Sequence, residues 1–425
     1  RDWSSDVCSS DLAAIGAACG AATLAKGPIG LVLPLASFLL FALFAAWRGR
    51  PRSLTGWWAG LRGIRPGTIV LAAAAVAAPW YAWVAIRTDG SWLRDFLLVH
   101  NVGRFAAPME GHSGSLLYYP AVVAVGLFPW SIVLAAMLAH AAAILRSPGD
   151  ERRGPLALVA SWMLVWIGAF SCAGTKLPGY IWPAYPALAI ATAVLLDDWA
   201  GGRAVFSWLH MPRGFRSPRA TTEHDPEHAV GLVMRLAWSI LAGCGVALGV
   251  ALPMAAGRLA AGGWWLALVG LVPLATAVGA WHCQTRGLRR RAVAFMTVGA
   301  CLLVGLMASV VAESFSHAQG SRTLVATLDQ PAESCQWACL WNVPPSLVFY
   351  TNARIDKLDT AADVAAHLRR HPRARVVIDS RQEQLVTAML PAGCGVLARV
   401  PTLGRHDFLL LGRRPEHDAP LALAD

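Results

Sequence analysis

Charged residues are scarce in this chain, and their scarcity excludes an ordinary soluble domain. Only 14% of the 425 residues are Asp, Glu, Lys or Arg, whereas soluble domains carry about 25%. Hydrophobic residues reach 56%, and the mean hydropathy is +0.49. These apolar runs are more than one globular core needs, so the composition predicts an integral membrane protein.

Ionisable residues are nearly absent from the apolar runs, which argues against a transporter or channel with a polar path across the membrane. His140 is the one deep candidate, and Arg235 lies near the end of its run. The net charge of +11 does not indicate nucleic-acid binding, because the arginines sit in short loops where they set membrane topology. A non-catalytic membrane scaffold stays open as an alternative.

Nine apolar runs predict nine membrane helices, most of them near the ~20 residues that span hydrocarbon. The runs are Ala13–Ala25, Ile29–Trp47, Thr68–Ile86, Leu116–Leu145, Leu156–Cys172, Tyr180–Leu196, Leu232–Ala256, Trp264–His282 and Ala292–Ala312. Basic loops alternate with balanced or uncharged ones. The positive-inside rule therefore predicts Arg48–Arg65 in the cytoplasm and the tail after Glu313 outside. On this topology Lys26 and Lys176 lie on one face.

The first twelve residues differ in composition from the rest of the chain. They are rich in Ser and Asp, have no initiator Met, and resemble translated adapter sequence. We interpret residues 1–12 as a non-native scar and assign the membrane domain to residues 13–312. The natural N-terminus is expected to lie upstream.

Residues 313–425 predict a small C-terminal α/β domain. Strands are expected at Val376–Ile378 and Phe408–Leu411, and a helix at Ala361–Arg370 with Asp359-Thr360 as its cap. Three cysteines of this tail are left open between one disulfide and free thiols. They are Cys335, Cys339 and Cys394.

Two short motifs place a lysine shortly before a proline at the mouth of a helix. One is Lys26-Gly27-Pro28, and the other is Lys176-Leu177-Pro178, which leads to Tyr180. Such a lysine either contacts a phosphate, together with the N–H groups that open the helix, or reaches toward lipid headgroups. Two lysines on one face favour the anion site.

The loop Arg87–Ser115 is the part of the sequence that we expect to face a substrate. It mixes both charge signs with aromatic residues, and its candidate contacts are His100, Arg104 and His112. We interpret it as lying flat on the membrane surface, with its rings toward lipid and its charges toward water. The alternative is an interfacial loop in which Arg104 contacts lipid headgroups.

These motifs resemble, in order, segments of the bacterial GT-C glycosyltransferases. Lys26-Gly27-Pro28 resembles their TKGP segment, and Thr175-Lys176-Leu177-Pro178-Gly179-Tyr180 resembles their KLPxY segment. The loop residues Phe96, His100-Asn101, Arg104-Phe105 and Tyr118-Tyr119 resemble the external loop between them. The resemblance covers roughly residues 13–200. It is to the lipid A aminoarabinose transferases and their protein mannosyltransferase-like relatives (glycosyltransferase families 83 and 39).

The resemblance implies an enzyme of the bacterial inner membrane with a GT-C-like helical bundle and a periplasmic C-terminal domain. It would take a sugar from a polyprenyl-phosphate carrier and pass it to lipid A, another glycan or a protein. No cofactor is expected, with a divalent cation left open.

The residues implied for the carrier and substrate site come from all three motifs. They are Lys26, His100, Arg104, His112, Lys176 and Tyr180. We expect Lys26 and Lys176 to hold one phosphate between them, with Arg104 in or near the same pocket.

The catalytic base of the family is an acidic residue in a first external loop, which should precede residue 13. Asp89, Asp95 and Glu110 do not stand in that motif. The chain as given is therefore expected to be inactive by itself.

Overall fold

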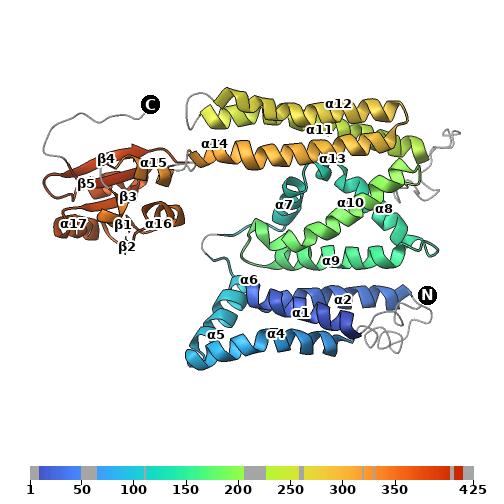
Figure 1. Ribbon diagram of the computed structural model, residues 1–425, viewed down its shortest axis with the longest axis horizontal. Coiled ribbons are helices and arrows are strands. Elements are labelled where there is room, and N and C mark those ends of the chain that lie inside the picture. The colour runs from blue at the N-terminus through green and yellow to red at the C-terminus, as the bar shows by residue number, and fades with distance from the viewer. Residues whose placement is uncertain are drawn as a thin grey trace. The chain divides into compact units, whose positions relative to one another are not determined.

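The computed structural model describes residues 9–48, 65–109, 112–204, 226–257, 263–317, 320–328, 331–402 and 406–414. The chain divides into two compact units, one of residues 1–241 with 279–294, the other of residues 242–278 with 295–425. Helices make up the described part of the first unit, and the second ends in a mixed β-sheet with helices around it (Figure 1). The predicted class, a helical membrane part followed by a small α/β domain, is confirmed.

The helices follow the predicted apolar runs. Those of the first unit are α1 (Ser9–Lys26), α2 (Ile29–Arg48), α4 (Pro66–Arg87), α5 (Ser91–Asp95), η1 (Phe96–Gly103), α6 (Arg104–Ala106), α7 (Tyr118–Gly126), η2 (Trp130–Val133), α8 (Leu134–Arg146), α9 (Arg153–Cys172), η3 (Pro178–Ala184) and α10 (Tyr185–Ala200). Three more helices have residues in both units. They are α11 (Pro226–Gly257), α12 (Leu271–Thr285) and α13 (Arg289–Leu306). Because α1 begins at Ser9, the last residues of the stretch set aside as a scar are helical.

Fewer helices qualify as membrane spans than the nine predicted. By length and composition, six helices of the described residues can cross a membrane, or seven if one bent pair counts as a span. α2 qualifies only as a shorter apolar helix over Ile29–Phe44. α1 is rich in Ala and Gly and carries Ser, Thr and Asp, so it is less apolar than α2 and α4. Most of the predicted cytoplasmic loop Arg48–Arg65 lies outside the described residues.

The prediction of one continuous helix over Leu116–Leu145 is wrong. α7 and the helix formed by η2 and α8 meet at a bend of 118°. Pro129 stands at this break. Proline has no N–H for the helix ladder and pushes the residue before it out of the helical conformation, so a sharp change of direction is favoured here.

The segment expected to be a flat surface loop is mostly helical. Its residues form α5, η1 and α6 in succession. The rings of Trp92 and Phe96 stack with centroids 4.8 Å apart, and Phe96 also lies 6.1 Å from the ring of Tyr81 in α4. The rings of Trp92 and Phe96 pack on one another and on α4, so the interpretation of a flat loop is corrected, while contact of the loop's rings with lipid stays a prediction.

Small residues bring α1 and α4 into close contact. A Cβ atom at Gly16 would lie 2.5 Å from the carbonyl oxygen of Ile69, and one at Gly20 would lie 2.6 Å from that of Ala73. Glycines spaced four residues apart let two membrane helices approach to backbone contact. α1 is therefore held by its fit to α4.

A buried carboxylate joins α8, α10 and the start of α9. The side chain of Asp198 is 1% exposed and accepts from Nε2 of His140 at 2.7 Å, from Arg152, and from Nε of Arg203 at 3.1 Å. His140, which the sequence singled out as the deep ionisable residue, is thus part of an ion-paired cluster. We call these four residues the Asp198 cluster.

The second unit carries the C-terminal domain. The elements that lie wholly within the second unit are η6 (Gly263–Gly270), η7 (Met307–Val311), α14 (Ala312–His317), α15 (Gly320–Ala326), η8 (Ala332–Ser334), β1 (Gln336–Leu340), α16 (Pro345–Thr351), β2 (Ile355–Leu358), α17 (Ala361–Arg370), β3 (Ala374–Asp379), η9 (Ser380–Gln382), α18 (Glu383–Thr387), β4 (Cys394–Val400) and β5 (Phe408–Arg413). The strand order is β2-β1-β3-β5-β4, with β1 parallel to β2 and β3, and β5 antiparallel to β3 and β4. The predicted helix and both strands are confirmed, and Thr360 caps α17 through a reciprocal pair of hydrogen bonds with Asp363.

The two faces of this sheet bury separate apolar cores. On one face Val376 and Leu409 pack with α17, and on the other Trp337 and Leu410 pack with α15 and α16. The three cysteines of the domain are free thiols. Burial raises the pKa of Cys339 to about 12, so its thiol stays protonated at neutral pH.

Candidate functional site

Lys26 is the last residue of α1, and the chain turns directly after it into α2. Gly27 has a φ of +82°, which favours glycine, and its N–H donates to the carbonyl of Thr23 at 2.8 Å. A Cβ atom at Gly27 would lie 2.9 Å from Oδ1 of Asn101. Pro28 immediately precedes α2, and its fixed φ suits the start of a helix. The turn therefore fixes Lys26 beside η1.

η1 is a π-helix, in which each N–H bonds to the carbonyl five residues back. Across one such turn, Nδ2 of Asn101 donates to the carbonyl of Phe96 at 2.7 Å. The wider turn places Phe96, His100, Asn101 and Arg104 along the wall of one cavity. Short π-helical segments frequently occur at functional sites.

The turn after α9 is bound to the segment that begins at Arg104. The N–H of Gly174 donates to the carbonyl of Phe105 at 2.6 Å, and that of Thr175 to the carbonyl of Arg104 at 3.2 Å. A Cβ atom at Gly174 would lie 2.7 Å from the carbonyl carbon of Ala107, so only glycine permits this approach. The two segments run side by side and position Arg104 opposite Tyr180.

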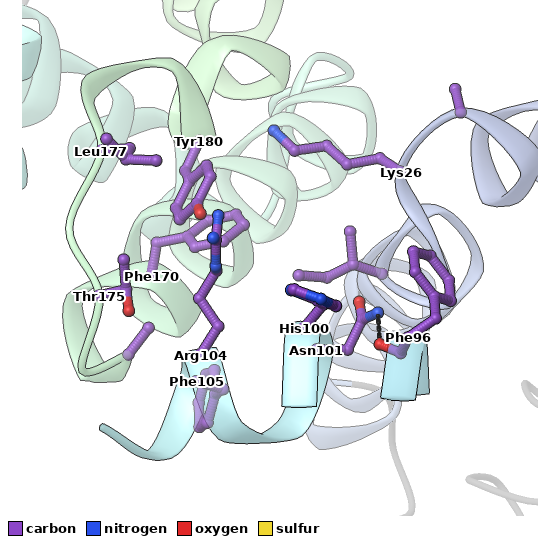
Figure 2. A pocket seen from close by; sticks show the side chains of 13 residues that line it. Lys26, Phe96, His100, Asn101, Arg104, Phe105, Phe170, Thr175, Leu177 and Tyr180 are labelled. Atoms are coloured by element: carbon purple, nitrogen blue, oxygen red, sulfur yellow. Dashed lines mark hydrogen bonds between the residues drawn. The ribbon is translucent and has the colours of Figure 1, made fainter. Parts of the chain in front are cut away.

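A cavity of about 340 Å³ lies between the end of α1, the helix η1 and the turn after α9. Its lining residues are Ala25, Lys26, Ile29, Phe96, His100, Asn101, Arg104, Phe105, Phe170, Ala173, Thr175, Leu177 and Tyr180. Figure 2 shows Lys26 and Arg104 reaching the ring of Tyr180 from two different walls. The Nζ atom of Lys26 lies 4.7 Å from the centroid of that ring, which also packs on Phe170 at 4.9 Å.

The charge of the cavity is one-sided. Lys26 and Arg104 are cationic, His100 can become so, and no Asp or Glu is among the described residues that line it. Ammonium and guanidinium groups next to an amide and an aromatic face make a site for an anion with an apolar neighbourhood. Across the described ranges, no group of three His, Cys, Asp or Glu side chains is placed to hold a metal ion.

Four of the six predicted contact residues meet in this cavity, namely Lys26, His100, Arg104 and Tyr180. Lys176 and His112 are not among its lining residues. The backbone N–H of Lys176 donates to the carbonyl of His112 at 2.8 Å, while the side chain of His112 is exposed. The ammonium group of Lys176 is buried and donates to three backbone carbonyls.

The sequence did not single out several residues that line the cavity. Asn101 and Phe96 stood within the matched loop motif but were not assigned a role, although an amide beside a histidine was a usable signal. Phe170 gave no such signal, because a phenylalanine near the end of an apolar helix looks like any core residue.

Comparison with curated proteins finds aminoarabinose transferases. The chain is 33% identical over 176 residues to the undecaprenyl phosphate-alpha-4-amino-4-deoxy-L-arabinose arabinosyl transferase of Pseudomonas aeruginosa (strain LESB58), a match covering 41% of this chain and 29% of the relative. It is 32% identical over 211 residues to the enzyme of that description from Pectobacterium carotovorum, covering 47% and 34%. The chain thus spans about a third of the length of these relatives. No protein-family model matches it.

Comparison with solved structures finds the same kind of protein. The fold matches that of ArnT from Cupriavidus metallidurans bound to undecaprenyl phosphate, with a TM-score of 0.62 and 20% sequence identity, over 96% of this chain and 70% of that one. The apo structure of that protein gives a TM-score of 0.63. The likeness shows that the fold is of the GT-C type, and both comparisons agree with the family that the motifs resemble.

Proposed function

We propose that this chain is part of a glycosyltransferase that takes its sugar from a polyprenyl-phosphate carrier, and that the cavity at Lys26 binds the carrier phosphate. The observation that carries the proposal is the meeting of Lys26, Arg104 and Tyr180 from three separate motifs around one cavity, whose described lining residues include no carboxylate. The relatives described as undecaprenyl-phosphate-dependent transferases, and a similar fold that binds undecaprenyl phosphate, support it.

The cations of the cavity suit a reaction in which the carrier phosphate is the leaving group. Transfer breaks the bond between the anomeric carbon of the sugar and the phosphate oxygen, while an acceptor hydroxyl forms the new bond to that carbon. Negative charge then accumulates on the departing phosphate, and cations already in place lower the barrier. Lys26 and Arg104 would supply them. By the resemblance, an acidic residue of a first external loop would remove the acceptor proton.

The cavity walls suit the rest of the carrier. Phe96, Phe105 and Leu177 line it together with the cations, and Phe105 is 49% exposed. An isoprenoid chain needs an apolar surface next to its phosphate, and an aromatic face beside a cation site provides it. We assign the acceptor to lipid A, the cavity to the periplasmic face of the inner membrane, and the C-terminal domain to the periplasm, as the resemblance implies.

Binding of undecaprenyl phosphate to the full chain in lipid nanodiscs tests the proposal. Lys26→Met keeps the length of the side chain and removes its charge. A charge-assisted hydrogen bond contributes about 1.5–3 kcal/mol, so the dissociation constant should rise about tenfold or more. Lys357→Met is the matched control, because that lysine is on the C-terminal domain with only a loose ion pair to Asp359 at 3.9 Å.

Two outcomes would refute the carrier site. One is that Lys26→Met binds undecaprenyl phosphate as well as the wild type does. The other is that undecaprenol, which lacks the phosphate, displaces the carrier as effectively as unlabelled undecaprenyl phosphate.

A further inference from the structure

We propose that Lys176 is a positioning residue: its buried ammonium group holds the turn that fixes Arg104 and Tyr180 in the cavity, and does not contact the substrate. The inference rests on the proposed function of that cavity. On this inference Lys176 supports the cavity, whereas Lys26 contacts the phosphate.

The hydrogen bonds of the Lys176 ammonium group account for all of its donors. Nζ donates to the carbonyls of Phe170 at 3.1 Å, Ser171 at 2.5 Å and Ala173 at 2.7 Å. An ammonium group has three N–H donors, so none is left for a phosphate. The residue is 5% exposed, and its Nζ lies 5.7 Å from the ring centroid of Tyr119.

Two of the carbonyls, those of Phe170 and Ser171, belong to the last turn of α9, and the third belongs to its C-cap residue, Ala173. A helix leaves its last C=O groups without partners in the helix. A basic side chain that bonds them also meets the negative end of the helix dipole. Lys176 comes shortly after α9, so the bonds fold the chain back on itself in a tight turn. Ala173, whose carbonyl is one of the three, also lines the cavity.

That turn is what binds the Arg104 segment. Besides the backbone bonds of Gly174 and Thr175, the Thr175 hydroxyl donates to the carbonyl of Ala107 and accepts from the N–H of Met109, both at 3.1 Å. The N–H of Lys176 bonds to the carbonyl of His112. We call this set of bonds, which joins residues 104–109 and His112 to residues 174–176, the latch.

The other side of the turn leads to Tyr180. The hydroxyl of Tyr119 donates to the carbonyl of Leu177 at 3.2 Å and lies 3.3 Å from the N–H of the same residue. Leu177 immediately precedes η3, which carries Tyr180. Lys176 thus stands between the latch on one side and the aromatic wall of the cavity on the other.

Hydrogen exchange on the full chain in nanodiscs, without carrier, tests the latch directly. Lys176→Met should speed exchange of the four amides that donate in the latch, those of Met109, Gly174, Thr175 and Lys176, by about tenfold or more, because a turn that has lost its cap opens more often. Thr175→Val should do the same while the ammonium group stays in place. Lys357→Met should leave these amides unchanged.

Carrier affinity then separates positioning from contact. If Lys176 acts by placing Arg104 and Tyr180, Lys176→Met weakens binding of undecaprenyl phosphate in the wild-type background but adds less once Arg104→Met is present, because only Tyr180 is then left to be displaced. If Lys176 contacts the phosphate itself, its effect persists in the Arg104→Met background. Lys176→Arg, which keeps a cationic donor, should restore part of the affinity and of the protection.

Unchanged exchange of the latch amides, at Met109 and residues 174–176, in both Lys176→Met and Thr175→Val would overturn the inference. So would an equal loss of affinity with and without Arg104. If Lys176→Met does not fold, Thr175→Val carries the test. If the wild type binds no undecaprenyl phosphate, the proposed function fails, and the exchange measurement still decides whether the latch exists.

Discussion

Positively charged side chains lie near both ends of α9, but their surroundings differ. Near its start, Arg152 pairs with Asp150 and with the buried Asp198, which also binds His140 and Arg203. Near its end, Phe170 lines a cavity into which Lys26 and Arg104 reach, with no carboxylate among its described lining residues. A helix of this length separates the two by about 30 Å, the thickness of a bilayer core.

The difference shows which charges serve the fold and which serve a ligand. A buried carboxylate with several cationic partners is satisfied within the protein, and removing it leaves those partners uncompensated. Cations that gather around a cavity create a positive potential there, which attracts an anion. The same residue types therefore predict stability at one end of α9 and anion binding at the other.

The largest expected effect is the loss of the Asp198 carboxylate. Asp198→Ala should lower the free energy of unfolding by about 2–3 kcal/mol, because the buried His140 loses its hydrogen-bond partner and the partly exposed Arg152 and Arg203 lose their shared carboxylate. Thermal or denaturant unfolding in detergent measures it. Asp197→Ala is the matched control: its side chain is 79% exposed and pairs with the same Arg203, so its effect should stay within about 1 kcal/mol. Equal effects of the two substitutions would contradict the comparison.

The next effect comes from adding a carboxylate to the cavity. Asn101→Asp has nearly the same shape and puts a negative charge close to Lys26, Arg104 and His100. It should weaken binding of undecaprenyl phosphate by about tenfold or more relative to Asn101→Leu, since 1.4 kcal/mol is a factor of ten. The leucine variant loses the same bond to Phe96 without adding charge. Similar affinities in the two variants would show that charge is not what the cavity recognises.

The smallest effect concerns Asp150, which shares Arg152 with the Asp198 cluster. The hydrogen bonds from Arg152 hold the pKa of Asp150 below its ordinary value. A carboxyl whose pKa is lower in the folded state stabilises the fold at neutral pH, and this contribution is lost as the pH falls below about 3.9 and through the folded-state pKa.

Asp150→Asn should therefore destabilise by no more than about 1 kcal/mol at pH 7. The difference from the wild type should shrink in acid, as a series of unfolding curves at decreasing pH would show. A gap that widens on acidification would mean that Asp150 does not act through its charge.

Most helices of the membrane part could be predicted from the sequence, because a lipid environment restricts the structures that a chain can form. A chain in hydrocarbon must bury its backbone polar groups in helices, so the apolar runs mark them. The bend at Pro129 was missed because a proline can kink a membrane helix slightly or break it, and the outcome depends on neighbouring helices. The helical character of residues 91–106 was missed because the segment mixes charges and rings without a clean period.

The candidate site could be predicted only in part. Lys26, His100, Arg104 and Tyr180 were expected together because their motifs resemble those of one family, and no local pattern in the residues predicts that they meet. Lys176 and Lys26 look alike in sequence, since each stands shortly before a proline. The signal that separates them was local: Lys176 follows a helix end whose carbonyls need partners.

The close fit of α1 to α4 has a consequence for the order of synthesis. α1 is the least apolar of the early helices, and its Gly16 and Gly20 face the backbone of α4. A ribosome adds about 5–20 residues per second, so α1 leaves it several seconds before α4 is complete. During that interval the surface of α1 around Gly16 and Gly20 is not yet covered by α4. A bulkier residue at Gly20 should therefore harm biogenesis first, seen as more rapid degradation of newly made chains.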